Sequence, residues 1–253
     1  MGIGALQRRL DEATSLAPGS DFSLRVLWVA PVVCLGVLLT LGLVLQPFPE
    51  LFRLVMHSEG GVVENLVVIL ALTGAVMALR LVGASGQPAL LRLWYGLFFL
   101  MLVFLAGEET SWGQHWFGWA TPESFAALNE QGETNLHNLP IDWIEDAPKT
   151  LVIVTMMLAG GLAPLFIAFT GSGLHLPMWL MAIWPSAALW PTTAVYVGLR
   201  IVERGIAATM DVSSWGLHFR PLREGIEVFI ALFLFLYLWS QWRRLRAARA
   251  AAA

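Results

Sequence analysis

The sequence predicts an all-α fold, a polytopic membrane helical bundle with about six transmembrane helices. Of its 253 residues, 57% are hydrophobic and only 13% are charged, which is about half the charged fraction of a soluble domain. Six apolar runs each come close to the ~20 residues that a helix needs to cross a bilayer. They lie at about 24–46, 62–82, 90–107, 150–170, 176–199 and 225–241. We therefore expect a single integral membrane domain over residues 1–253.

The first run, 24–46, is as long as a complete membrane span. Arg8 and Arg9 precede it, and no small-residue cleavage site follows it. A cleavable signal peptide has a shorter apolar core and such a site. We therefore expect this helix to remain in the protein as a signal anchor.

The fourth and fifth runs contain residues that interrupt helices. Gly160, Gly161 and Pro164 lie in the fourth run, and Pro185 and Pro191 lie in the fifth. Proline removes a backbone donor and clashes with the preceding turn, so these prolines should kink their helices. Such breaks persist in membranes where neighbouring helices or cavities satisfy the freed carbonyl groups.

The charges between the runs predict the orientation. If the N-terminus is cytoplasmic, the inner segments carry nine arginines and three acids, whereas the outer segments carry six basic residues and fifteen acids. Cytoplasmic loops are enriched in lysine and arginine, and six spans leave both termini on one side. The tail, rich in arginine and alanine, is typical of a bacterial source. We expect a multi-pass protein of the bacterial inner membrane with both termini cytoplasmic and an acidic outer face.

The segment 108–149 is the longest of the outer segments. Thr121, Pro122 and Glu123 resemble a helix start, with an N-cap, a proline in the first turn and an acid near the positive end of the helix dipole. Tryptophans on both sides suit the headgroup region of a bilayer. We expect a short interfacial helix with flanking turns over the outer mouth of the bundle.

The candidate catalytic residues lie where the third run ends. Ionisable residues at a membrane boundary are costly unless they are paired, solvated or used. Glu108 and Glu109 are adjacent and would repel each other unless a cation lies near. If the helix continues past Gly107, Glu108 shares one face with Ser111 and His115. We expect Glu108, Glu109 and His115 to be catalytic.

A metal site is the second hypothesis for this face. Glu133 and His137 are four residues apart, and a carboxylate and an imidazole one helical turn apart can bind a divalent metal ion or act as an acid–base pair. The cofactor of such a site would be a divalent metal ion. The predicted ligand set is Glu64, Glu109, His115, Glu133 and His137.

A structural interpretation of the outer charges stays open beside these hypotheses. Glu108 and Glu109 could pair with Arg200 or Arg204, and Glu203 could join the two arginines in a small exposed cluster. Pairs four residues apart could also be mutual surface partners that contribute a few tenths of a kcal/mol each. These pairs are Arg220–Glu224 and Arg223–Glu227.

Three functions remain open from the sequence. The first is a membrane-embedded enzyme that acts on a lipid or lipid-linked substrate at the outer leaflet, by metal-assisted hydrolysis or transfer. The second is a non-catalytic subunit or scaffold that binds a membrane-protein partner through segment 108–149. The third is a proton- or cation-coupled transporter that uses Glu64, Glu108 and Glu227.

Composition and motifs exclude several other classes. The single cysteine, Cys34, excludes a disulfide framework and a cysteine metal cluster. The chain has no P-loop, dinucleotide fingerprint or basic nucleic-acid patch. We therefore expect membrane lipids as partners and no nucleic acid.

Overall fold

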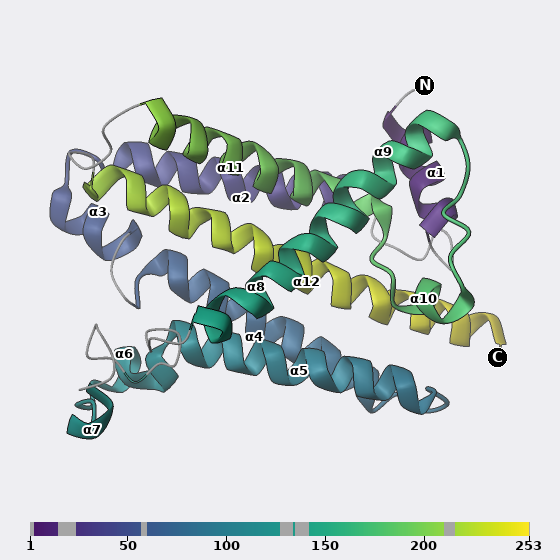
Figure 1. Ribbon diagram of the computed structural model, residues 1–253, viewed down its shortest axis with the longest axis horizontal. Coiled ribbons are helices and arrows are strands. Elements are labelled where there is room, and N and C mark those ends of the chain that lie inside the picture. Colours follow the sequence, from purple (N-terminus) through teal and green to yellow (C-terminus); the bar gives the residue numbers. More distant parts are fainter. Residues whose placement is uncertain are drawn as a thin grey trace.

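The computed structural model describes residues 3–14, 24–56, 60–126, 134, 142–209 and 216–252. These residues form helices and no strands (Figure 1). The α-helices are α1 (Ile3–Thr14), α2 (Leu24–Val44), α3 (Pro49–Met56), α4 (Val62–Val82), α5 (Ala89–Glu109), α6 (Gln114–Phe117), α7 (Glu123–Ala126), α8 (Asp142–Met157), α9 (Ala163–Thr170), α10 (Met178–Ile183), α11 (Trp190–Thr209) and α12 (Gly216–Ala252). Shorter 3-10 turns lie at Ser111–Gly113 and Ala187–Leu189, and a π-helical segment lies at Leu158–Leu162.

The prediction of a multi-pass membrane protein is confirmed at the level of the helices. Within the described residues, five helical stretches are long and apolar enough to cross a bilayer, and α8 and α9 together form one of them. Large apolar side chains point outward from α2, among them Val29, Val33 and Leu43, each more than half exposed. Soluble monomers rarely expose such continuous apolar surface. The five stretches are Val26–Val44, Val62–Val82, Ala89–Glu109, Lys149–Thr170 and Gly225–Ala251.

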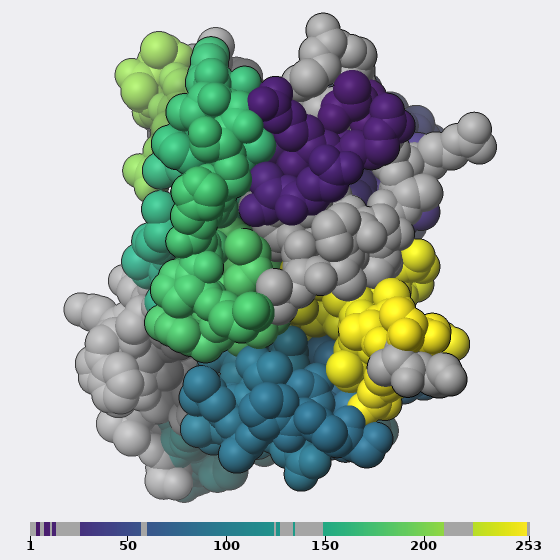
Figure 2. Space-filling view, turned by 90° about the vertical axis from the view of Figure 1, so that its right-hand side faces the viewer, coloured from purple at the N-terminus to yellow at the C-terminus, as the bar shows by residue number. Residues whose placement is uncertain are grey.

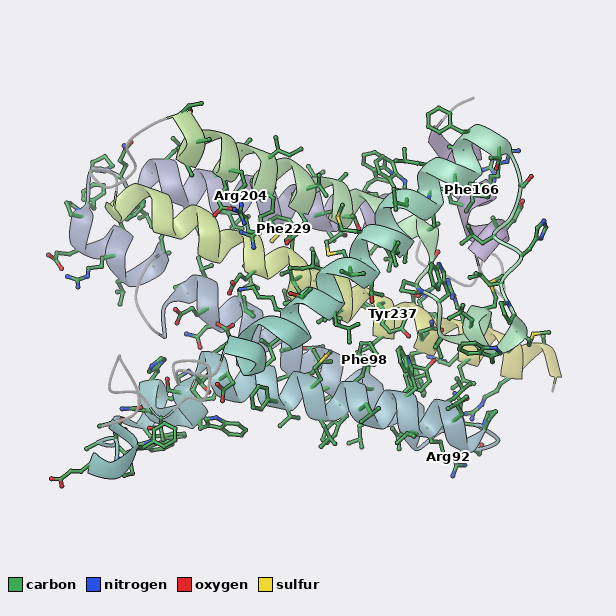
Figure 3. All side chains as sticks on the ribbon, in the orientation of Figure 1. Arg92, Phe98, Phe166, Arg204, Phe229 and Tyr237 are labelled. Carbon is green, nitrogen blue, oxygen red and sulfur yellow. The ribbon has the colours of Figure 1, made fainter. Side chains whose placement is uncertain are left out.

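The core of the bundle is built around α12. In the most apolar part of this helix 78% of the residues are buried, whereas the share is 17–39% in the other four stretches. Phe229, Phe233 and Leu236 of α12 are almost completely buried. α4 packs against both α12 and α5, and Figure 3 shows Phe229 and Tyr237 on the central helix. A surrounded helix can be apolar on every side, as most of α12 is.

The fifth predicted run, 176–199, is not one helix. α10 ends at Ile183, and α11 begins only at Trp190 and continues to Thr209. Pro185 lacks the backbone donor that would continue α10, and the second residue of α11 is a proline, which a first turn tolerates. The kink predicted from these prolines is therefore a complete break, and the bounds expected for this helix were wrong.

Side chains of α12 satisfy the carbonyl groups that this break frees. The hydroxyl of Tyr237 donates to the carbonyl of Ile183 at 2.8 Å. Gln241 Nε2 and Arg244 Nη1 donate to the carbonyl of Trp184 at 3.4 and 3.3 Å. In hydrocarbon a freed carbonyl without a partner is costly, so irregular backbone occurs where protein groups replace the missing bonds. Three residues of α12 meet that requirement.

The interruption predicted in the fourth run is a widened turn instead of a break. α8 and α9 continue into each other through the π-helical segment Leu158–Leu162. Gly160 lies so close to α11 that a Cβ built on it would be 2.0 Å from the hydroxyl oxygen of Thr193. That hydroxyl donates to the carbonyl of Met156 at 3.5 Å. A glycine is therefore required where the π-helical segment meets the first turn of α11.

The two ends of the bundle carry different helices. α1 and the last turns of α12 lie at one end, here called the terminal end, which Figure 2 views directly (Figures 1 and 2). There Leu10 of α1 is buried against Ile167 and Ala187, and Arg9 Nη2 donates to the carbonyl of Gly171 at 2.9 Å. The opposite end, here called the distal end, carries α3, α6 and α7 (Figure 1).

Candidate functional site

The backbone takes an unusual form at the distal end of α5. The helix ends at Glu109, and Thr110 caps it. The next three residues, Ser111, Trp112 and Gly113, have φ angles of 46°, 57° and 100°. A positive φ is uncommon for a residue with a side chain and costs about 1–3 kcal/mol. Strain of this kind is concentrated at functional sites, which makes this turn a candidate.

The turn brings a serine hydroxyl onto a histidine. Ser111 Oγ lies 3.0 Å from His115 Nε2, and Ser111 is fully buried. The carbonyl of Thr110 accepts the backbone N–H of Gly113 at 2.9 Å and that of His115 at 3.3 Å, which closes the turn. α5 continues past Gly107 only to Glu109, and α6 starts anew at Gln114, so Glu108, Ser111 and His115 do not share one face of a single helix. A hydroxyl on an imidazole nitrogen is nevertheless placed to lose its proton to that ring.

Glu108 is buried beside this turn. It is 5% exposed, and its Oε1 accepts a 2.6 Å hydrogen bond from Trp112 Nε1. The indole ring lies over Gly107, where a Cβ would come within 2.9 Å of it, and meets the ring of Phe104 edge-on. Glu109 is half-buried as the last residue of α5. The two predicted acids therefore lie three and two residues before Ser111 in the chain.

The first turn of α4 packs against the same site. Asn65 Nδ2 donates to the carbonyls of Gly60 and Gly61 at 2.6 and 2.8 Å, and its Oδ1 accepts Trp116 Nε1 at 3.0 Å. Gly60 has φ +74°, and a Cβ there would lie 3.1 Å from Cβ of His115. Asn65 thus joins α6 to α4, and Gly60 leaves room for the histidine.

Glu64 reaches the site through Gly60. Its Oε2 accepts the backbone N–H of Gly60 at 2.5 Å. This contact reaches one residue beyond the N-cap residue Gly61, so it fastens the turn that precedes α4. It places the carboxylate of Glu64 on the glycine that packs against His115.

Gln114 fastens the outer segment to α6. Its Nε2 donates to Thr121 Oγ1 at 3.0 Å. Its Oε1 accepts both the backbone N–H and the hydroxyl of Thr134, at 2.8 and 2.7 Å. One amide side chain thus joins two points of the segment that follows the serine–histidine pair. α7, at Glu123–Ala126, is a single short turn at the position where an interfacial helix was expected.

The predicted metal ligands are only partly described. Glu133 and His137 lie outside the described residues. Among the residues that are described, no three His, Cys, Asp or Glu side chains form a group that could hold a metal ion. Glu64, Glu109 and His115 therefore do not make such a site by themselves, and the five-residue set stays a prediction.

The structure describes part of two of these charged clusters. Glu203 is 7% exposed and accepts a 2.8 Å bond from Arg200 Nη1 within α11, whereas Arg204 is exposed, so the predicted exposed cluster is exposed only in part. Glu227, expected beside Arg223, forms an ion pair with Lys149 of α8. This pair joins two helices that are far apart in the sequence. The side chain of Arg223 lies outside the described residues.

Ser111, Asn65 and Gln114 make most of the polar contacts of the site, and none was predicted to be functional. Two sequence features could have indicated these residues. Ser111 lies two residues before Gly113, a glycine that permits the chain to turn at the end of a helix. Asn65 is a polar residue in the first turn of an apolar span. The chain matches no protein-family model, no curated protein and no solved structure.

Proposed function

We propose that this protein is a membrane-embedded enzyme that hydrolyses or transfers an ester group of a lipid or lipid-linked substrate at the outer leaflet. The 3.0 Å contact between Ser111 Oγ and His115 Nε2 carries the proposal. Serine is a weak nucleophile until an adjacent base takes its proton, and this contact supplies the base. The positive φ of Ser111 supports the same role.

In the proposed reaction, Ser111 Oγ attacks the carbonyl carbon of the ester while His115 Nε2 takes the hydroxyl proton. The intermediate collapses, its bond to the alcohol oxygen breaks, and the departing alcohol takes the proton from His115. The acyl group is then held on Oγ. Water or a second alcohol attacks that acyl group, gives its proton to His115, and releases the product as the proton returns to Ser111. Glu108 and Glu109 complete the proposed catalytic set, three and two residues before Ser111 in the sequence.

A substrate at headgroup depth fits the aromatic side chains near the pair. Trp116, Phe117 and Trp119 are exposed by 51%, 75% and 42%. The rings of Phe117 and Trp119 are stacked with centroids 5.8 Å apart. Exposed aromatic residues with polar neighbours are typical of the membrane–water interface. They support a site that takes its substrate from the bilayer surface.

The proposal includes a membrane orientation. We propose six crossings of the bacterial inner membrane, made by the five apolar stretches and by α11. Both termini then lie in the cytoplasm. The position of α1 and the end of α12 at one end of the bundle supports an even number of crossings (Figure 1). The surplus of arginine in the segments assigned to that end supports the cytoplasmic side. The distal end then faces the periplasm.

The first experiment is covalent labelling of the purified protein in detergent. A fluorophosphonate with a long alkyl chain reacts with activated serines, and mass spectrometry of peptides locates the adduct. We expect the adduct on Ser111, none at that position in Ser111→Ala, and labelling slowed by about a hundredfold or more in His115→Gln, because general-base catalysis contributes at least that factor. Because Ser111 is fully buried, labelling also measures whether the turn opens.

A matched control separates activation from folding. Ser186 is another buried serine, and its Oγ accepts the backbone N–H of Ala188. Ser186→Ala should leave labelling of Ser111 unchanged. An adduct rate that His115→Gln does not alter, in a variant with the wild-type melting temperature, would contradict the proposed base. Absence of any adduct on Ser111, with a membrane protein co-purifying, would favour the non-catalytic subunit.

A metal-assisted form of the reaction is tested separately. It would use Glu133 and His137 together with Glu64, Glu109 and His115 as ligands of a divalent ion, which would activate water. Elemental analysis of the purified protein would then find about one divalent ion per chain, lost in His137→Ala. A protein that contains no metal and still labels at Ser111 would reject the metal-assisted form and retain the serine–histidine reaction.

A transporter is the second candidate, and the interrupted helices favour it. The π-helical segment Leu158–Leu162 and the late start of α11 at Trp190 lie in contact within the bundle. Discontinuous helices line the substrate sites of many secondary transporters. Glu64, Glu108 and Glu227 would carry protons or cations. Reconstituted vesicles that show no proton or cation flux under a pH gradient would reject this candidate.

A further inference from the structure

A pocket lies between four helices in the distal half of the bundle. Leucines and glycines of α2 line it together with Phe52 and Met56 of α3, Leu199 of α11 and Gly225 of α12. The space measures about 290 Å³. α2 contacts each of the other three helices, and the four lie together in Figure 1. One continuous space is thus shared by residues of four separate elements.

Two glycines leave this space open. A Cβ built on Gly42 of α2 would meet no neighbouring group within 4 Å, and one built on Gly225 of α12 would meet Leu38 at 3.7 Å, an ordinary contact. Protein interiors are usually packed as densely as organic crystals, with few voids larger than a water molecule. The pocket is therefore a place where this chain does not fill its own volume.

The lining of the pocket is apolar except at one end. Phe52 and Met56 are buried, whereas Leu39 and Leu43 are more than half exposed. The pocket therefore continues into the outward apolar surface of α2. Among the described residues that line the pocket, Gln46 alone has a polar side chain, and it lies in the turn between α2 and α3.

The depth and the volume of the pocket select its occupant. The apolar stretch of α2 ends at Val44, so the lining residues from Leu35 to Leu43 lie in the membrane-spanning part and Gln46 lies at its boundary. Apolar cavities exclude water and take apolar molecules, and one of ~150 Å³ binds benzene. This pocket has about twice that volume, which is room for a chain of roughly ten carbon atoms. A helix, about 10 Å wide with its side chains, is too large for it.

We propose that the pocket binds one acyl chain of a phospholipid from the surrounding bilayer, with Gln46 at the ester end of the chain. The chain fills the space that Gly42 and Gly225 leave open. The amide of Gln46 has two N–H donors, and the ester carbonyl of a phospholipid is an acceptor for them. The proposal does not depend on the serine–histidine chemistry.

The test uses the purified full chain in digitonin, a detergent with a rigid sterol body and no alkyl chain to compete for the pocket. Native mass spectrometry measures the binding of dioleoylphosphatidylcholine. A phosphatidylcholine with a diazirine in one acyl chain is then bound and irradiated, and mass spectrometry of peptides locates the adducts.

Two glycines of α2 provide a matched pair of variants. Gly42→Leu places a side chain in the pocket. Gly36→Leu is the control, because a Cβ at Gly36 also meets nothing within 4 Å but this residue does not line the pocket. Gln46→Leu removes the amide, and a diether phosphatidylcholine, which lacks the ester carbonyl, is the matched control lipid for it.

We expect the wild type to retain one phosphatidylcholine per chain and to carry adducts on the lining residues of α2 and α3. Gly42→Leu should weaken binding by about fivefold or more, since overpacking of a filled space costs at least that factor. Gly36→Leu should change binding by less than about threefold, as most surface substitutions do. Gln46→Leu should weaken binding of the diester lipid by about fivefold and leave that of the diether lipid unchanged.

Three results would overturn the proposal. Equal binding to the wild type, Gly42→Leu and Gly36→Leu would reject the pocket as the site. Adducts spread evenly over outward side chains of α2 such as Val29 and Val33 would show only general contact with lipid. An equal effect of Gln46→Leu on the diester and diether lipids would reject the hydrogen bond to the ester. Should Gly42→Leu fail to fold, the positions of the adducts in the wild type decide the question.

Discussion

The hydroxyl of Tyr237 donates a 2.8 Å hydrogen bond to the carbonyl of Ile183, the last residue of α10. The same hydroxyl accepts Trp94 Nε1 at 3.0 Å, and the ring packs against Phe98 with centroids 5.4 Å apart (Figure 3). One side chain of the central helix therefore joins α5 to the break at Pro185. The break is held in place by α12 as well as by its own sequence.

Tyr237→Phe should destabilise the protein by about 1–2 kcal/mol. The change leaves the Ile183 carbonyl and the Trp94 N–H without this partner, and buried hydrogen bonds between membrane helices contribute up to about that amount. Unfolding in mixed detergent measures the loss. Thr73→Val is the control, because the Thr73 hydroxyl donates to the carbonyl of Ile69 within its own helix. Equal losses in the two variants would show that the contact to Ile183 has no special importance.

Gly160→Ala should disrupt the contact of α8 and α9 with α11. The new Cβ would lie 2.0 Å from Thr193 Oγ1 and 3.3 Å from the ring of Phe233, and overpacking of a core typically costs about 1–3 kcal/mol. Thr193 is 1% exposed, so it has little room to move.

Gly161→Ala is the neighbouring control for this substitution. A Cβ at Gly161 would meet the methyl group of Thr193 at 3.8 Å, which is ordinary contact. The melting temperature of Gly161→Ala should therefore stay near that of the wild type, whereas Gly160→Ala should melt lower. Adding Thr193→Ala to Gly160→Ala should recover part of the loss. Equal effects of the two glycine substitutions would mean that helix propensity and not the clash decides.

The long apolar spans could be predicted from the sequence because length and hydropathy decide them locally. The start of α4 at Val62 agrees with the predicted run, and the end of α5 at Glu109 lies within two residues of its predicted end. The failure at 176–199 has a physical cause. Pro185 was expected to kink a continuous helix. The hydroxyl of Tyr237 in α12 donates to the freed carbonyl of Ile183, so a complete break between α10 and α11 leaves that carbonyl satisfied. No local pattern near Pro185 contains that donor.

The site shows the same division between local and long-range information. A spacing of four residues brings Ser111 and His115 together in a helix, and their proximity survives although α5 ends at Glu109, before both of them. The link between Asn65 and Trp116 joins residues 51 positions apart, so no spacing rule reveals it. The ion pair of Glu227 with Lys149 escapes the same kind of rule, because the two residues are 78 positions apart.

Exchange of the charges of Lys149 and Glu227 should restore the stability that is lost when either charge is reversed alone. The pair joins α8 to α12, and both side chains are about one third exposed, so we expect the pair to contribute only about 0.3–1 kcal/mol. Lys149→Glu and Glu227→Lys each place like charges together and should lower the melting temperature. The double variant should recover most of that loss, and high salt should reduce every difference. A double variant as unstable as the sum of the singles would contradict a direct interaction.

Gln114→Leu should release the outer segment without unfolding the bundle. The Gln114 amide bonds to Thr121 and to the backbone N–H and hydroxyl of Thr134, and leucine keeps a similar volume without these bonds. Amide exchange in peptides that cover 118–134 should accelerate by about tenfold, since a lost hydrogen bond of about 1.4 kcal/mol changes a local opening equilibrium by that factor. Gln46→Leu is the control, because Gln46 lines an apolar pocket formed by α2, α3, α11 and α12. This substitution should leave exchange in 118–134 unchanged. If exchange in Gln114→Leu matches that of the wild type, contacts other than those of Gln114 hold the segment in place.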